Sequence, residues 1–129
     1  KDIWPHFISC CLVVTEKMIK EHPELVADLV RGIAQSGEWA ETHRMDAAKV
    51  AAPYFRQNEE VVRYVLTQPK DRVSYRMLNP TDQELQNIGD MGVKAGVLKK
   101  PVNVKELVDR SFIPKDIKPA DIDMRRMVN

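Results

Sequence analysis

Residues 8–14 read Ile-Ser-Cys-Cys-Leu-Val-Val, a short apolar run near the start of the chain. Its length and its β-branched residues are typical of a strand, and an apolar run without polar alternation is typical of a strand buried on both faces. Strands of this kind occur in parallel and mixed sheets. The sequence therefore predicts a buried strand at Ile8–Val14 that needs neighbouring strands.

Helical patterns dominate the chain after this run. Thr15 is predicted to cap a short helix through Lys20, and Pro23 suits the first turn of the next helix because its missing N–H would be unpaired there. The helix from Pro23 has one apolar stripe at three- and four-residue spacing: Leu25, Val26, Leu29, Val30, Ile33 and Ala34. Leu29 lies in mid-stripe, so we expect it to be buried against a sheet.

Capping residues predict where the later helices begin: Asp46, Asn58 and Thr81, the last in a capping box with Glu84. Gly96 suits a left-handed position at the end of the helix from Thr81. Between these helices, Arg72–Arg76 alternates polar and apolar residues and is predicted as a second short strand. Val104–Val108 is predicted as a short helix, and the tail after Pro114 as loosely ordered.

Composition restricts the classes of function. The chain has 129 residues with 43% hydrophobic and 30% charged residues, which is typical of one globular domain. Its formal net charge of +1 argues against nucleic acid as a partner. No apolar run reaches the ~18 residues of a transmembrane helix, and no secretory signal follows Lys1. The adjacent Cys10 and Cys11 fit neither a disulfide nor a zinc site, so we expect two small buried apolar residues.

This inventory of elements leaves the predicted strand without enough partners. A sheet of two strands is marginal by itself, and a strand with open edges tends to pair with another chain. We therefore expect the chain to be part of a larger α/β protein, and we expect the isolated chain to dimerise or swap through this strand.

The order of these motifs resembles a known family, the solute-binding proteins of ABC importers. The branch is the nitrate/taurine/alkanesulfonate type, which includes binders of thiamine-pyrimidine precursors. The resemblance extends over roughly Ile3 to Pro114, and its main motifs are Trp4-Pro5, Cys11–Val14, Ile19–Val26, Trp39-Ala40, Ala47–Ala52, Asn58–Val62, Leu98–Pro101, Leu107–Asp109 and Ser111–Pro114.

The resemblance implies a fold and a role. The fold is α/β, the C-terminal part of a type II periplasmic-binding-protein-like fold that is mostly helical with one or two strands. Residues 1–15 would be a crossover segment and the buried strand, and residues 16–129 the helical part of the first lobe with a C-terminal tail. The protein would capture a small polar or anionic solute for a membrane permease, in the periplasm or as a cell-surface lipoprotein. It would not be an enzyme and would need no cofactor.

Four residues are predicted to bind the ligand: Trp4, His6, Ser9 and Arg76. By the resemblance, Trp4, His6 and Ser9 lie at the edge of the cleft, where an indole could wall a ligand and the polar groups could bond its oxygens. Arg76 could pair with a carboxylate or sulfonate through two hydrogen bonds. The competing interpretation makes Trp4 part of the core and Arg76 a solvated surface residue. No catalytic or metal-binding constellation is predicted.

Two other classes of function remain open. The first is an enzyme similar to the fungal thiamine-pyrimidine-precursor synthase, whose cysteine-rich motif precedes this strand; Cys10 and Cys11 fall just after that motif, which puts the chemistry in doubt. The second is a helical protein-interaction domain that uses the stripe between Pro23 and Trp39.

Overall fold

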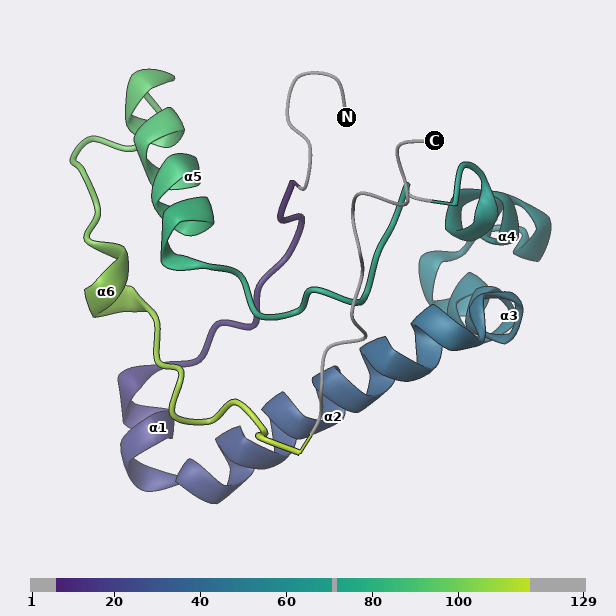
Figure 1. The fold of residues 1–129 in the computed structure, drawn as a ribbon, viewed down its shortest axis with the longest axis horizontal. Helices are drawn as coiled ribbons and strands as arrows, with labels where there is room; N and C mark the ends of the chain where they lie inside the picture. Colours follow the sequence, from purple (N-terminus) through teal and green to yellow (C-terminus); the bar gives the residue numbers. More distant parts are fainter. Residues whose placement is uncertain (1–6, 71, 117–129) are drawn as a thin grey trace. The chain divides into compact units, whose positions relative to one another are not determined.

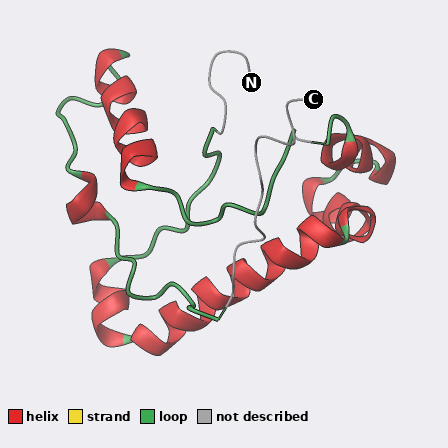
Figure 2. Cartoon of the chain, in the orientation of Figure 1, coloured by secondary structure: helices red, strands yellow, loops and turns green. Residues whose placement is uncertain are grey.

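A computed structural model describes residues 7–70 and 72–116, and over these ranges the chain contains six helices and no strand (Figures 1 and 2). The helices are α1 (Glu16–Glu21), α2 (Pro23–Thr42), α3 (Arg44–Phe55), α4 (Glu59–Thr67), α5 (Asp82–Lys94) and α6 (Val104–Leu107). Two compact units divide the described chain. The first consists of the residues up to Val30 and Asn79–Ile113, and the second of Arg31–Leu78 and the residues from Pro114 on.

The predicted α/β class is wrong for the residues that the structure describes. Ile8–Val14 makes no backbone–backbone hydrogen bond to another described residue, and Leu12 and Val13 are exposed, not buried. Arg72–Arg76 is not a strand either, because its backbone bonds to side chains of α2 and α3. A strand exists only where a second strand pairs with it, and these ranges supply none. The periplasmic-binding-protein-like fold that the resemblance implied is therefore not found.

Most of the predicted helix ends are confirmed. The Thr15 hydroxyl accepts from the Met18 amide at 3.1 Å, and the Asn58 side chain accepts from the Glu60 amide at 2.9 Å. Thr81 and Glu84 form the expected capping box at the start of α5. The prediction for Asp46 is wrong, because the backbone of α3 already begins at Arg44.

In the first unit, glycines let α5 approach the chain that follows it. A Cβ atom on Gly89 would lie 2.6 Å from Cγ2 of Val102, so any side chain at this position would force Val102 or the backbone to shift. Gly96 has a φ of +74°, which confirms its predicted left-handed position after α5. The amides of Val97 and Gly96 donate to the carbonyls of Gly92 and Val93, the paired bonds of a Schellman motif. Val104 of α6 is buried in this unit.

In the second unit, α3 and α4 pack directly against each other. Small side chains on α3 allow this, since the buried cluster combines alanines of α3 with larger residues of α4: Ala47, Ala48, Ala52, Val62 and Leu66. Val73 and Tyr75, from the segment after α4, pack against the same cluster. This packing fixes the extended segment beside the C-terminal end of α4.

The apolar stripe of α2 is oriented differently from the prediction. Val26 is buried, but Leu29 is 39% exposed, and Leu25 and Ile33 on the same side of the helix are also exposed. Further along α2, the buried positions are Gly37 and Glu41. The expectation that Leu29 is buried against a sheet is therefore wrong. No helix among the described residues is long and apolar enough to span a membrane.

Candidate anion-binding site

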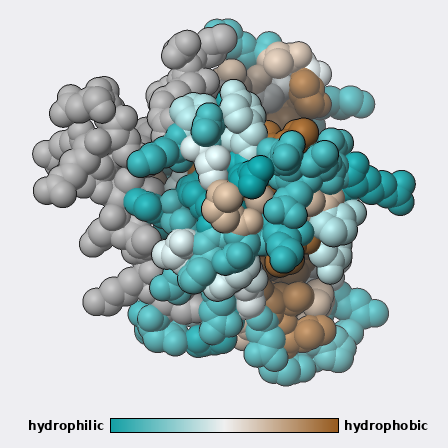
Figure 3. Space-filling view, turned by 90° about the vertical axis from the view of Figure 1, so that its right-hand side faces the viewer, coloured by the Kyte–Doolittle hydropathy of each residue, from teal (hydrophilic) through white to brown (hydrophobic). Residues whose placement is uncertain are grey.

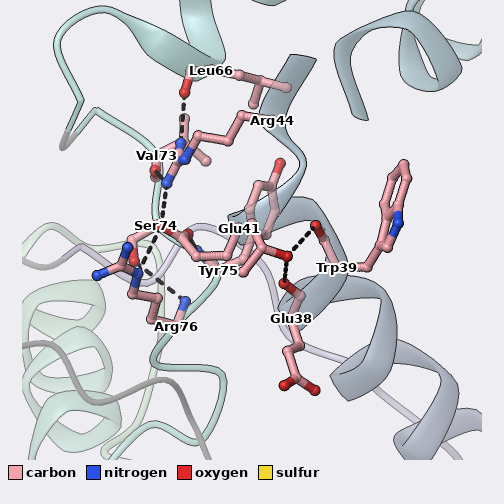
Figure 4. A network of polar contacts seen from close by, with 10 residues as sticks. Glu38, Trp39, Glu41, Arg44, Leu66, Val73, Ser74, Tyr75 and Arg76 are labelled. Atoms are coloured by element: carbon pink, nitrogen blue, oxygen red, sulfur yellow. Dashed lines mark hydrogen bonds and ion pairs between the residues drawn. The ribbon is translucent and has the colours of Figure 1, made fainter. Parts of the chain in front are cut away.

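A cluster of three charged side chains joins α2, α3 and the extended segment after α4 within the second unit (Figure 4). Glu41 lies in the last turn of α2, Arg44 is the first residue of α3, and Arg76 follows Tyr75 in the extended segment. The short break between α2 and α3 brings the first two side chains together. The packing of Val73 and Tyr75 on the core brings the third.

Glu41 is the centre of the cluster. Its side chain is only 4% exposed, so its carboxylate needs partners within the protein. Oε1 accepts a hydrogen bond from Nη2 of Arg44 at 2.7 Å, and Oε2 accepts from the Tyr75 amide at 2.9 Å. Nε of Arg76 lies 2.8 Å from Oε1, close enough for an ion pair but without the direction of a hydrogen bond. The carboxylate therefore connects both arginines to α2.

The pKa of Glu41 lies below the usual value for a glutamate. Burial opposes ionisation and would raise the pKa, but the hydrogen bonds from Arg44 and from the Tyr75 amide and the positive charges of both arginines outweigh that effect. The carboxylate is thus ionised at neutral pH. One negative charge faces two positive charges, so the cluster retains one net positive charge.

Both terminal nitrogens of Arg44 donate hydrogen bonds within the protein. Its Nη1 donates to the Leu66 carbonyl at 2.6 Å, and its Nη2 donates to the Val73 carbonyl at 2.9 Å as well as to Glu41 (Figure 4). Leu66 lies in the last turn of α4, where free carbonyl groups favour a cation. Arg44 is therefore a structural tie between α3, α4 and the extended segment.

Arg76 is different because its outer donors are available. Its side chain is 34% exposed, and neither terminal nitrogen donates a hydrogen bond to another residue among residues 7–70 and 72–116. The Arg76 amide lies 3.3 Å from the Ser74 hydroxyl, which helps to fix the backbone. A guanidinium that is held at Nε and open at its two terminal nitrogens can donate two parallel hydrogen bonds to a carboxylate, sulfonate or nitrate.

An apolar pocket of about 290 Å³ shares three residues with this network. The lining residues come from the end of α3, from α4 and from the extended segment: Phe55, Gln57, Val61, Val62, Val65, Leu66, Val73 and Tyr75. Figure 3 shows hydrophobic groups among hydrophilic ones on the side where α3 and α4 are drawn. The pocket has almost no polar groups, so it could not hold an anion by itself.

The structure does not bring the four predicted ligand-binding residues together at one described site. Trp4 and His6 lie outside the described residues. Ser9 is exposed in the first unit, in a segment without secondary structure, and Arg76 belongs to the second unit. Sequence reasoning missed Glu41 and Arg44, which position Arg76. The signal available for them was the Glu-x-x-Arg spacing of residues 41–44, which is common on helix surfaces.

Comparison with known proteins adds no assignment, since no family model, curated protein or solved structure matches the chain. Among the described residues there is also no group of three or more His, Cys, Asp or Glu side chains that could hold a metal ion. The chemistry that the site can perform follows from its guanidinium alone.

Proposed function

We propose that this chain captures a small anionic solute at Arg76, as the solute-binding component of an importer that delivers the solute to a membrane permease. The observation that carries the proposal is the partly exposed side chain of Arg76, held beside the buried Glu41 while its two terminal nitrogens donate no hydrogen bond to another described residue. In this role the protein would act in the periplasm or at the cell surface. The proposal assigns no reaction to the chain.

Electrostatics support an anion over a neutral solute. The cluster of Glu41, Arg44 and Arg76 keeps a net positive charge. The two positive groups are not equivalent, because both terminal nitrogens of Arg44 donate hydrogen bonds within the protein and those of Arg76 donate none to a described residue. An arriving anion would therefore bind Arg76. Its planar fork matches a group with two or three oxygens on one atom.

The order of sequence motifs supports the transport role, because the resemblance to solute-binding proteins implies this class of ligand. The all-helical structure of the described residues removes the cleft between two α/β lobes as the binding place. The proposal therefore rests on Arg76 and on the motif order.

Titration calorimetry of the chain against nitrate, taurine, an alkanesulfonate and a neutral pyrimidine tests this function. We expect heat of binding for at least one anion and none for the neutral pyrimidine. Arg76→Gln should weaken binding by roughly 10-fold or more, since it removes a charge-assisted bidentate contact.

Arg63→Gln is the matched control. Arg63 is 40% exposed, similar to Arg76, and its ion pair with Glu60 is long at 3.9 Å. If both variants weaken binding equally, the effect is general electrostatics and the assignment of Arg76 is wrong. If no anion binds the chain, the proposed function is wrong.

A second candidate function is a helical protein-interaction domain, and the exposed side of α2 favours it. Leu25, Leu29 and Ile33 recur at four-residue spacing, and all are exposed. Such a stripe fits the apolar face of an amphipathic partner helix. Leu25→Ser with Ile33→Ser should abolish the capture of such a partner without changing the binding of anions at Arg76, so the two functions are separable.

A further inference from the structure

The segment Ile8–Val14 combines two features that leave it open to association. Its side chains include exposed apolar groups, with Val13 85% exposed, and its backbone makes no hydrogen bond to the backbone of another described residue. Every described residue with a positive φ lies elsewhere, so the segment is free of the left-handed conformations that a strand excludes. Exposed backbone groups of this kind can exchange their hydrogen bonds to water for hydrogen bonds to another strand.

The sequence of the segment also lacks protection against such pairing. Strand edges are commonly protected by lysine, by proline or by an inward charge, and Ile8–Val14 contains none of these. Alternate residues point to opposite faces of a strand. One face would carry Ile8, Cys10, Leu12 and Val14, all apolar, and the other Ser9, Cys11 and Val13.

The segment is complementary to itself about its middle residue. In an antiparallel pair related by a two-fold axis at Cys11, Ile8 lies opposite Val14 and Cys10 lies opposite Leu12. Both pairs are apolar and lie on the same face, and no like charges meet. This is the one antiparallel register that pairs all residues from Ile8 to Val14, because a shift in either direction leaves residues at the ends unpaired.

We propose that Ile8–Val14 is a homodimer interface, in which two copies of this chain pair these segments as an antiparallel ribbon centred on Cys11. Such a ribbon is marginal without a packed face. Leu25 and Leu29 of α2, in the same unit as the segment, offer exposed apolar surface that could cover it. The proposed interface uses none of the residues of the anion site, since the segment belongs to the first unit and Arg76 to the second.

Cysteine oxidation tests the register directly, because Cys10 and Cys11 are both free and exposed. Opposite residues of an antiparallel pair have Cα atoms about 4.5–5.5 Å apart, within the range of a disulfide. Diamide, which takes up the two electrons and two protons that two thiols lose, should link two copies of Cys10→Ser through Cys11. Two copies of Cys11→Ser should link at least roughly 10-fold more slowly, because the remaining Cys10 thiol of each copy faces Leu12 of the other copy and not a second thiol.

Sedimentation under reducing conditions tests the association itself. We expect the monomer–dimer ratio to change with concentration and the dimer to dominate at high concentration. A chain that stays monomeric at every concentration overturns the proposal, and so does equal cross-linking of the two single-cysteine variants. Capture of a strand from a different polypeptide in place of self-association would count as such a failure.

Proline substitutions at two neighbouring positions of the segment provide a matched pair of variants. Consecutive N–H groups of a strand point to opposite edges, so only one of Leu12→Pro and Val13→Pro removes a donor that faces the partner copy. The variant that loses this donor should have a dissociation constant roughly 10-fold higher or more. Both copies of the dimer carry the substitution, so two hydrogen bonds between the strands are lost. The other variant should dimerise nearly as the parent does, and both should keep the helical circular-dichroism signal. Equal effects of the two prolines would overturn the pairing.

Discussion

The sequence predicts two segments as strands, Ile8–Val14 and Arg72–Arg76. They differ in the partners that the structure gives to their backbone. Val73 and Tyr75 have backbone partners in the side chains of Arg44 and Glu41, and their own side chains pack on the α3–α4 core. Ile8–Val14 makes no backbone hydrogen bond to another described residue, and its side chains are largely exposed. The difference shows that a buried carboxylate and a guanidinium can replace a strand as the partner of an extended backbone.

Replacement of Glu41 should cause the largest loss of stability, because it removes the carboxylate that holds Arg72–Arg76. Glu41→Leu would leave Arg44, Arg76 and the Tyr75 amide without the carboxylate that they share, and we expect a loss of about 3 kcal/mol in the free energy of unfolding. Urea unfolding followed by circular dichroism measures it. Glu38→Leu is the control, since Glu38 is exposed one turn earlier and its carboxylate points away from the arginines in Figure 4. An equally small loss in both variants would show that the cluster does not hold the extended segment.

Acid should weaken the same contact by a smaller amount, because a protonated carboxyl group still fills its site. The pKa of Glu41 is lower in the folded chain than in the unfolded chain, so its stabilisation is complete above the unfolded pKa and is lost as the pH falls through the folded pKa. Unfolding of the parent and of Glu41→Gln between about pH 6 and about pH 3 measures this.

The stability difference between the parent and Glu41→Gln should shrink as the pH falls. Asp109 and Asp116, whose pKa values are also lowered, contribute equally to both proteins and cancel. A difference that stays constant with pH would mean that the Glu41 charge adds nothing to stability.

The geometry of the guanidinium can be separated from its charge. Arg44→Lys keeps the positive charge but loses the planar fork that reaches two carbonyl groups and Glu41, so we expect a loss of about 1–2 kcal/mol. Arg63→Lys on α4 serves as control, because its contact with Glu60 is long and exposed. If Arg44→Lys unfolds at the same urea concentration as the parent, charge alone holds the extended segment.

Local signals in the sequence predict the helices well and the tertiary structure poorly. Thr15, Asn58 and the Thr81–Glu84 pair bond to amides within a few residues, so their side chains are enough to predict those helix starts. The extended segments depend on partners far away in the sequence: the carboxylate that holds Tyr75 is 34 residues away, and no local pattern encodes it. An apolar run resembles a buried strand whether or not a neighbour exists.

The candidate site was found only in part for the same reason. Arg76 was predicted from its residue type and its place in an extended segment, and the structure adds the group that positions it, Glu41. The side of α2 that is buried was misjudged because Leu25 and Leu29 fit the stripe as well as Val26 does. Which of them is buried depends on what packs against the helix, and periodicity carries no information about that.

The smallest expected change in the free energy of unfolding comes from a substitution in Ile8–Val14, and it tests the same comparison in the segment without backbone partners among the described residues. Val13→Ser removes a β-branched apolar side chain, which costs about 1 kcal/mol or more in a packed strand. Because Val13 is 85% exposed, we expect a change below roughly 0.5 kcal/mol, the range of ordinary surface substitutions. Urea unfolding has to be measured on dilute protein, where copies of the chain do not associate, so that the result reports the single chain.

Val73→Ser in the other segment is the matched variant and should cost more, since Val73 packs against the α3–α4 core. Equal losses for the two valines would mean that Ile8–Val14 is packed as firmly as Arg72–Arg76, and the contrast between the segments would disappear.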